Sequence, residues 1–247
     1  MILQVQNLNK SFGGISASSD LNLEVAKGQV HAIVGPNGAG KTTLIAQLSG
    51  VLKPDSGNII FNGKNITKAS AYRRAHIGLA RSFQITSVIL PMTVLENVML
   101  AVQSLSGHSF RFWSPASQES HSREQAQQYL IDVGLGQRAG ALAGEIAHGE
   151  QRQLEIAMAL ALTPQLLLLD EPTAGMSKDE SGNIIKLLNK LKGQITILLI
   201  EHDMDAVFAL ADTTSVLVDG HIIATGNTEQ IRQNPEVQRA YLGDSPA

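Results

Sequence analysis

The segment from Gly35 to Thr42, GPNGAGKT, is the feature that most constrains the fold of this chain. It satisfies the pattern G-x-x-x-x-G-K-[ST] directly after the apolar run Val30 to Val34, and directly before a helical stretch from Thr42 to Leu48. Backbone N–H groups in such a loop can wrap a phosphate, and the N-terminus of the following helix adds its positive dipole. The alternative, a glycine-rich turn that matches by chance, leaves the flanking strand and helix unexplained.

The residues of this loop have separate predicted roles. Lys41 is expected to reach the β and γ phosphates of a nucleotide, and the Thr42 hydroxyl to ligate Mg²⁺. The predicted nucleotide contacts are Gly35, Asn37, Gly38, Ala39, Gly40, Lys41, Thr42 and Thr43. The motif predicts the α/β fold of P-loop nucleotide hydrolases, with a mainly parallel RecA-like sheet. It leaves open which reaction the nucleotide serves.

A strand that ends in two carboxylates lies far downstream of the loop. The run Leu166 to Leu169 is continuously apolar and is followed by Asp170 and Glu171. Because the C-terminal ends of parallel strands deliver ligands at one edge of a sheet, both acids are expected beside the phosphate loop. Asp170 is suited to hold Mg²⁺ through water, and Glu171 to orient or deprotonate an attacking water. A helix-capping acid after a strand is the alternative, and it accounts for only one of the two.

Apolar periodicity predicts a β-rich start, a helical middle and an α/β remainder. Short strands are expected at Leu3 to Val5 and Leu21 to Val25, and helical spacing runs from Thr93 to Leu162 with a Ser-rich break from Ser104 to Ser122. Further strands are expected at 166–169, 195–200 and 215–218, a helix at 179–192, and hairpin turns at Asn62-Gly63 and Asp219-Gly220.

These patterns predict a single domain over residues 1–247. Residues 1–90 and 163–247 are expected to form an N-terminal antiparallel β subdomain and the RecA-like core, and residues 91–162 an inserted α-helical subdomain.

Composition excludes several classes of function. The 19 basic and 22 acidic residues give a net charge of -3, so no basic field exists to hold nucleic acid. The absence of cysteine removes disulfides, thiolate zinc sites and cysteine nucleophiles. Met1 to Gln6 shows no secretory pattern, and the longest apolar run, Ile156 to Leu162, is far shorter than the roughly 20 residues that cross a bilayer. Any work at a membrane therefore requires another chain as anchor.

Five motifs of the chain follow one another in a single order. They are the phosphate loop, Arg81-Ser82-Phe83-Gln84, Ile146 to Gln151, the strand ending in Asp170-Glu171, and Ile200-Glu201-His202-Asp203. In this order they resemble the ATP-binding subunit of ABC transporters, and the likeness extends from Leu3 to Leu242. The resemblance implies ATP and Mg²⁺ as cofactors, hydrolysis of ATP to ADP and phosphate, and Glu171, His202 and Gln84 as catalytic residues.

Three residues receive their roles from the resemblance. It implies that Phe12 stacks on adenine, that Gln84 contacts Mg²⁺ or the attacking water, and that His202 contacts the γ-phosphate. Gln84 thereby joins Thr42 and Asp170 as an implied metal ligand. The alternatives are a strand-end core aromatic for Phe12, a surface amide for Gln84 and a structural histidine for His202.

Members of this family act in pairs. Two ATPase subunits pair head to tail, and the phosphate loop of one and the glycine-glutamine motif of the other enclose each ATP. Here that motif supplies Ala147, His148, Gly149 and Gln151. The implied partners are a second ATPase subunit, identical or different, integral membrane permease subunits and, indirectly, a substrate-binding protein, with no nucleic acid. The implied location is peripheral, on the cytoplasmic face of the inner or plasma membrane.

The implied permease groove lies beside Gln84 and the segment Ile85 to Glu96. Its apolar residues Ile85, Val88, Ile89 and Leu90 are unusual for a solvent face, and ordinary core packing is an equally weighted alternative.

Two positions depart from the family pattern. The usual Leu-Ser is replaced by Ile146-Ala147, and Ala147 lacks the hydroxyl that caps the following helix and donates to the γ-phosphate. The lost cap is worth about 1 kcal/mol and the lost bond to a charged phosphate about 1.5 to 3 kcal/mol. Ser177 stands where many relatives have aspartate, in the loop that crosses the dimer interface in the family.

Finer similarity points to the branched-chain amino acid type of importer ATPase. It rests on Glu171 to Met176, Glu201 to Val207, Asn234 to Val237 with Ala240 to Gly243, Phe112-Trp113, and Gly78 to Gln84. That group includes ATPases for urea and short amides. The same ATP chemistry also suits an ATPase that drives export or lipid extraction, and a soluble relative that acts on ribosomes or DNA. A nucleotide-binding module without catalysis is disfavoured by Glu171 and His202 together.

Overall fold

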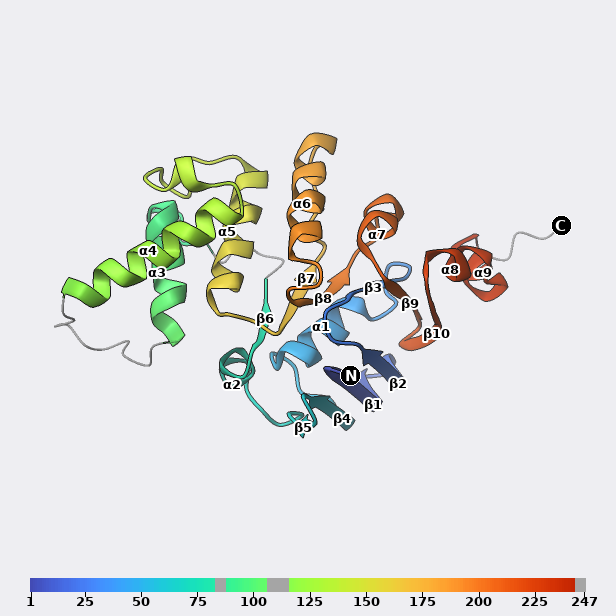
Figure 1. Ribbon diagram of the computed structural model, residues 1–247. Helices are drawn as coiled ribbons and strands as arrows, with labels where there is room; N and C mark the ends of the chain where they lie inside the picture. Colours follow the sequence, from blue (N-terminus) through green and yellow to red (C-terminus); the bar gives the residue numbers. More distant parts are fainter. Residues whose placement is uncertain (83–87, 106–115, 243–247) are drawn as a thin grey trace.

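The structure is a computed structural model that describes residues 1–82, 88–105 and 116–242 (Figure 1). The strands are β1 (Leu3–Phe12), β2 (Ile15–Val25), β3 (Val30–Val34), β4 (Ser56–Phe61), β5 (Lys64–Asn65), β6 (Leu79–Arg81), β7 (Leu166–Asp170), β8 (Thr196–Ile200), β9 (Thr213–Val218) and β10 (His221–Gly226). The helices are α1 (Lys41–Ser49), α2 (Ala71–His76), α3 (Val94–Leu105), α4 (Ala116–Asp132), α5 (His148–Ala161), α6 (Lys178–Leu191), α7 (Met204–Leu210), α8 (Thr228–Gln233) and α9 (Pro235–Leu242), with a 3-10 turn η1 (Gly136–Arg138).

The larger sheet is mainly parallel, which confirms the predicted fold class. Its strand order is β10-β9-β3-β8-β7-β6, and only β10 runs antiparallel to its neighbour. The strands β3, β7 and β8 are buried along their whole length, and this is why they are continuously apolar in the sequence. In the register, Ile33 and Asp170 both pair with Ile200. The three strands therefore end together at one edge of the sheet.

The smaller sheet is antiparallel, with the order β2-β1-β4-β5. The prediction of short strands here was wrong, because β1 extends to Phe12 and β2 begins at Ile15. Register shifts interrupt the β1–β2 pairing, and Asn7 and Asp20 have positive φ values of 47° and 46°. Such bulges break the period-two apolar pattern while the pairing continues, so the strands look shorter in the sequence than they are.

Both predicted hairpin turns are present. Asn62 and Gly63 join β4 to β5 with φ values of 48° and 73°, and Asp219 and Gly220 join β9 to β10 with 47° and 80°. Two successive positive φ values are what the preferred two-residue hairpin turns require, and Asn-Gly and Asp-Gly adopt them at low cost.

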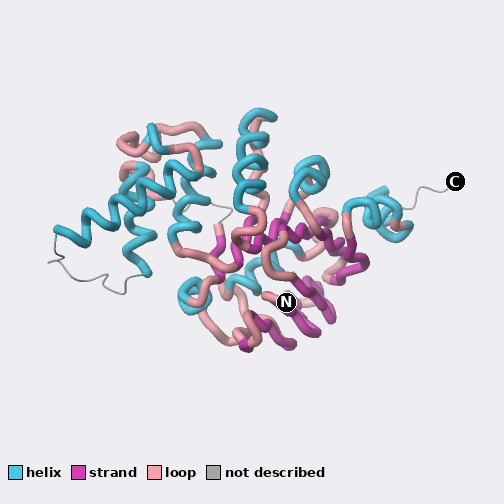
Figure 2. The backbone as a smooth tube through the Cα atoms, viewed as in Figure 1, coloured by secondary structure: helices cyan, strands magenta, loops and turns pink. Residues whose placement is uncertain are grey.

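The core lies on both sides of the larger sheet. Leu44, Ile45 and Leu48 of α1 pack between the two sheets, where they meet β1 and one face of β7. The opposite face of β7, including Leu167 and Leu169, packs against the helices α5 and α6. Figure 2 shows the strands of the larger sheet in the middle of the molecule with helices above and to either side, and the smaller sheet at the lower edge of the view.

The helices α3, α4 and α5 lie together at one end of the molecule (Figure 1). The predicted Ser-rich break from Ser104 to Ser122 was too long, because α4 begins at Ala116. The helix is polar on most of its surface, and tertiary packing of Ala126 and Leu130, both fully buried, stabilises it where helical propensity does not. Phe112 and Trp113 lie outside the described residues. The division of the chain into β and RecA-like parts (residues 1–90 and 163–247) and a helical subdomain (residues 91–162) stays a prediction.

Among the described residues, no helix combines the length and the apolar character needed to cross a membrane.

Candidate functional site

The phosphate loop joins the end of β3 to the start of α1, and its glycines are required by space and by backbone angle. A Cβ atom at Gly35 would lie 2.0 Å from the Leu217 carbonyl oxygen, and one at Gly40 would lie 2.2 Å from that of Ala17. Gly38 has open space around it, but its φ is 84°. Any side chain at Gly35 or Gly40 would therefore push the loop away from β9 or β2.

Lys41 is buried at the first position of α1, with 7% of its surface exposed. Its ammonium donates to the Gly35 carbonyl at 2.7 Å and to the Pro36 carbonyl at 2.9 Å. Burial lowers the pKa of Lys41, while the charges of Glu171 and Asp170 act in the opposite direction. The loop thus holds its own cation in place, beside two carboxylates. The neighbouring Thr42 side chain is exposed.

Asp170 is the buried acid at the end of β7, with 1% of its surface exposed. Its Oδ2 accepts from Arg81 Nη2 at 3.1 Å, and its main-chain carbonyl accepts from Arg152 Nη2 at 2.6 Å. Burial raises the pKa of Asp170, and the Arg81 guanidinium opposes that rise. Two arginines from different elements, β6 and α5, therefore fix this carboxylate and its backbone.

The donor set around Asp170 suits a hard cation. The described residues contain no cluster of three or more acidic, histidine or cysteine side chains that could enclose a metal. Mg²⁺ in nucleotide sites characteristically uses one or two protein oxygens plus phosphate oxygens and waters. A buried carboxylate and the exposed hydroxyl of Thr42 fit that chemistry.

Glu171 and His202 follow the adjacent strands β7 and β8, and their side chains approach each other. His202 Nδ1 lies 3.6 Å from Glu171 Oε2, and the two side chains are 58% and 26% exposed. The Glu171 N–H donates to the Ile200 carbonyl at 2.9 Å, which continues the pairing of the strands. Glu171 has a φ of 45°, a left-handed conformation that is strained for a residue with a side chain. The acid is thus held in a fixed, partly exposed position at the sheet edge.

Phe12 lies at the tip of the β1–β2 hairpin and is 51% exposed, so it is not a core aromatic. Lys10 Nζ lies 5.4 Å from the centre of its ring. The hairpin reaches the phosphate loop through β2, since Ala17 is the residue against which Gly40 packs. An exposed ring on a hairpin that contacts the loop is available for stacking.

The segment from Ile146 to Gln151 forms the entry to α5. Ala147 is the N-cap residue and makes no side-chain hydrogen bond, while its N–H donates to Glu150 Oε2 at 3.0 Å. The Gln151 amide donates to the Ala143 carbonyl at 3.1 Å and holds the preceding loop. His148 is exposed, and it lines a small pocket with Glu171 and Asp170.

Gly149 contacts a residue that the sequence pattern did not indicate. Its N–H donates to Glu180 Oε1 at 3.4 Å, and a Cβ at Gly149 would lie 3.0 Å from that side chain. Glu180 also accepts from the N–H and hydroxyl of Ser177, the N-cap residue of α6. The segment from Ile146 to Gln151 therefore contacts α6, whereas the phosphate loop contacts β2 and β9.

Comparison with known proteins gives the family. The family model described as "ABC transporter" matches residues 18–174, which is more than half of the chain. The chain belongs to the ABC transporter family. A second family model, described as "Branched-chain amino acid ATP-binding cassette transporter", matches residues 221–247.

Individual relatives cover nearly the whole of this ABC ATPase. The high-affinity branched-chain amino acid transport ATP-binding protein BraF of Pseudomonas aeruginosa is 39% identical, covering 99% of this chain and 98% of its own. The corresponding LivG protein of Escherichia coli (strain K12) is 36% identical with the same coverage. A crystal structure described as a nucleotide-free ATP-binding cassette from an ABC transporter has a TM-score of 0.86 at 33% identity, covering 98% of this chain and 99% of that one. The chain is therefore an ATP-hydrolysing transport ATPase.

Several residues of this ABC ATPase site were missed by sequence reasoning. Arg81, Arg152 and Glu201 received no role, although the two arginines bind Asp170 and Glu201 binds Thr173 in the loop after Glu171. A usable signal was present, because a charged residue at the end of an apolar strand, as at Arg81 and Glu201, requires a buried partner. Gln84, in contrast, lies outside the described residues.

Proposed function

We propose that this chain binds ATP with Mg²⁺ and hydrolyses it to energise the import of branched-chain or other hydrophobic amino acids. The observation that carries the proposal is the convergence of Lys41, Asp170, Glu171 and His202 at the edge where β3, β7 and β8 end. The relatives, named as high-affinity branched-chain amino acid transport ATP-binding proteins, support the solute class.

The proposed roles follow from charge and exposure. On nucleotide binding, the Lys41 ammonium replaces its hydrogen bonds to the carbonyls of Gly35 and Pro36 by hydrogen bonds to phosphate oxygens. Its charge therefore stays buried and paired. Thr42 and Asp170, with Gln84, would hold Mg²⁺, which would neutralise negative charge on the phosphates when bound. Glu171 orients or deprotonates the attacking water, and His202 contacts the γ-phosphate. A partly exposed acid and imidazole 3.6 Å apart can share one water between them.

The proposed ATP site is completed by a second ATPase subunit. Gly149 lies at the N-terminus of α5, where negative charge is favoured, and its backbone N–H already donates to a carboxylate, that of Glu180. The contacts of Gly149 are with Glu180 of α6, whereas Gly35 and Gly40 of the phosphate loop pack against β9 and β2, and this separation supports a role for the helix end at the ATP of a partner. Ala147, His148 and Gln151 accompany it.

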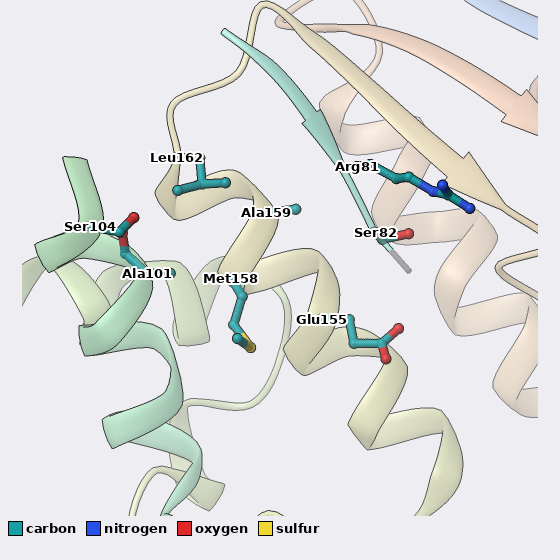
Figure 3. A pocket seen from close by; sticks show the side chains of 8 residues that line it. All are labelled: Arg81, Ser82, Ala101, Ser104, Glu155, Met158, Ala159 and Leu162. Atoms are coloured by element: carbon teal, nitrogen blue, oxygen red, sulfur yellow. The ribbon is translucent and has the colours of Figure 1, made fainter. Parts of the chain in front are cut away.

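The proposed permease contact is an apolar pocket between α3, α5 and β6, with a volume of about 210 Å³ (Figure 3). Its lining residues are Arg81, Ser82, Ala101, Ser104, Glu155, Met158, Ala159 and Leu162. In the segment that precedes α3, Val88 is buried, which fits core packing, whereas Ile89 and Leu90 are 42% and 49% exposed. An apolar pocket and exposed apolar side chains both suit contact with a helix of a membrane subunit, and the proposed peripheral membrane location follows from that contact.

Uptake by the assembled transporter tests the proposal. The chain is reconstituted in proteoliposomes with its permease, partner ATPase and binding-protein subunits, and ATP-dependent uptake of labelled leucine is measured. Glu171→Gln is expected to abolish uptake, while the matched change Glu124→Gln, at an exposed acid on α4, leaves it intact.

Three outcomes would contradict parts of the proposal. ATP-dependent uptake of urea or acetamide without leucine uptake would overturn the solute class. Net leucine efflux would overturn import, and unchanged ATP turnover in Glu171→Gln would overturn the role of that acid.

A further inference from the structure

Glu201 is a carboxylate with no exposed surface, one residue beyond the end of β8. Its Oε1 accepts from the N–H of Thr173 at 3.1 Å and from the Thr173 hydroxyl at 2.6 Å. Its Oε2 accepts from the N–H of His202 at 3.2 Å. Three donors from two chain segments are therefore collected by one side chain.

The two segments joined by Glu201 are the ones that carry Glu171 and His202. Thr173 lies two residues after Glu171, in the loop that leaves β7, and its own side chain is largely buried. At the strand ends, the N–H of Glu171 donates to the Ile200 carbonyl. Beyond the strand ends, the N–H of Thr173 donates to the Glu201 carboxylate, which is a second hydrogen bond between the same two segments. The exits of β7 and β8 are thus fixed to each other at two successive positions.

A buried carboxylate at this place is costly unless it has a function in the fold. Burial of a charge is tolerated when hydrogen bonds satisfy its oxygens, and charge-assisted hydrogen bonds are shorter and stronger than neutral ones. A smaller or apolar residue could fill the space, but it could not accept from three donors. The chemistry of Glu201 is therefore suited to holding two loops in a fixed relation.

We propose that Glu201 is a positioning residue for ATP hydrolysis, which sets the relation between the Glu171 carboxylate and the His202 imidazole. It acts through the backbone of His202 and through Thr173, and it touches neither nucleotide nor water itself. The inference rests on the proposed roles of Glu171 and His202. It predicts that turnover depends on Glu201 while nucleotide affinity, set by the separate phosphate loop, does not.

The conservative variant Glu201→Gln tests turnover and nucleotide affinity separately. A glutamine has the same shape but only one acceptor oxygen, so its amide group must face either the N–H of His202 or that of Thr173, donor against donor. In the full chain within its assembled transporter, kcat for ATP is expected to fall about 10-fold to 100-fold, the usual scale for a displaced catalytic group. The KM for ATP is expected to stay within about twofold of the wild type, because binding by the loop is untouched.

A matched control removes hydrogen bonds elsewhere in the same sheet. Ser215 on β9 has no exposed surface and bonds the His31 Nε2 at 2.8 Å and the Thr225 hydroxyl at 2.8 Å. Ser215→Ala is expected to lower the melting temperature, as Glu201→Gln does, without a selective loss of kcat. A double-mutant cycle with His202→Ala adds a second readout. If Glu201 acts through His202, Glu201→Gln reduces kcat much less in the His202→Ala background than in the wild type.

Each outcome decides between the two proposals. Wild-type kcat in Glu201→Gln, or equal kcat losses in Glu201→Gln and Ser215→Ala, overturns the inference about Glu201 while Glu171 and His202 stand. Wild-type turnover in both Glu171→Gln and His202→Ala overturns the proposed catalytic roles instead. A loss of kcat in Glu201→Gln that is fully additive with His202→Ala shows a general structural effect and also overturns the inference.

Discussion

Ala147 begins α5 without a hydroxyl, and neighbouring groups supply part of what a serine would give. The Glu150 carboxylate accepts from the Ala147 N–H, which is one half of a capping box, and the Glu180 carboxylate accepts from Gly149. The side-chain half of the cap is missing, because an alanine has no acceptor. The departure seen in the sequence therefore has a local structural cost that Glu150 only partly offsets.

Ala147→Ser is expected to strengthen the partner's ATP site, which we propose that this segment closes. In a pair with a different ATPase subunit, Glu171→Gln in this chain is expected to silence the chain's own site, so the remaining turnover reports on the partner's ATP. A new hydroxyl bond to a charged phosphate, about 1.5 to 3 kcal/mol, predicts a KM for ATP about 10-fold lower or better. Ala147→Gly is the control, since glycine improves the cap but adds no hydroxyl. Equal KM values for the serine and glycine variants would contradict a role for the hydroxyl.

His31 makes the stability of this ATPase depend on pH. It has no exposed surface, it bonds Ser215, and burial lowers its pKa from 6.5 to about 4. Between these pH values the unfolded chain binds a proton that the folded chain does not, so folding stability decreases as pH falls from 6.5 toward 4. The loss from this residue is about 3 kcal/mol at the lower end. In urea titrations, His31→Gln should remove that part of the slope of unfolding free energy against pH. An unchanged slope of unfolding free energy against pH in His31→Gln would contradict the role of His31.

At the scale of elements, the parallel strands were predictable and the antiparallel sheet was less so. Continuous apolar runs identify β3, β7 and β8, because both faces of these strands are covered. In β1 and β2, the register shifts place polar residues such as Lys10 and Ser18 within paired strands. A local pattern cannot show a bulge whose cause is a partner strand.

Ser177 at the start of α6 is a functional helix cap, although it departs from the family pattern. Its hydroxyl accepts from the Glu180 N–H, and the Glu180 carboxylate accepts from the Ser177 N–H and hydroxyl. Ser177→Ala is expected to lower the free energy of unfolding by about 1 kcal/mol, measured by urea denaturation. Ser177→Thr keeps the hydroxyl and should stay within about 0.5 kcal/mol of the wild type. Equal losses in the two variants would show that the cap contributes nothing.

At the scale of the whole molecule, the sequence motifs predicted which strand ends meet but not the side-chain contacts among them. The ends of β3, β7 and β8 meet because parallel strands share an edge, which the motif order was enough to predict. The ion pair of Arg81 with Asp170 depends on β6 lying next to β7, a pairing of distant segments. The contact of Gly149 with Glu180 likewise depends on how α5 meets α6. Such contacts require the packed structure.

Pairing of two ATPase subunits is the prediction that belongs to the whole molecule. Glu171→Gln is expected to bind ATP without hydrolysing it, so the closed pair should accumulate. Size-exclusion chromatography of the variant with its partner ATPase, in ATP and Mg²⁺, should show a species of paired mass, and replacing ATP by ADP should reduce it. A single monomeric peak in ATP would contradict the shared site.

The left-handed backbone at Glu171 affects which substitutions selection would favour at this position. A side chain in that conformation costs about 1 to 3 kcal/mol, which glycine would largely avoid. Selection for folding alone would therefore favour losing the acid, whereas the proposed role of Glu171 in turnover would favour keeping it. Among descendants of this chain, a glycine at position 171 would mark copies that keep the fold but have been released from transport.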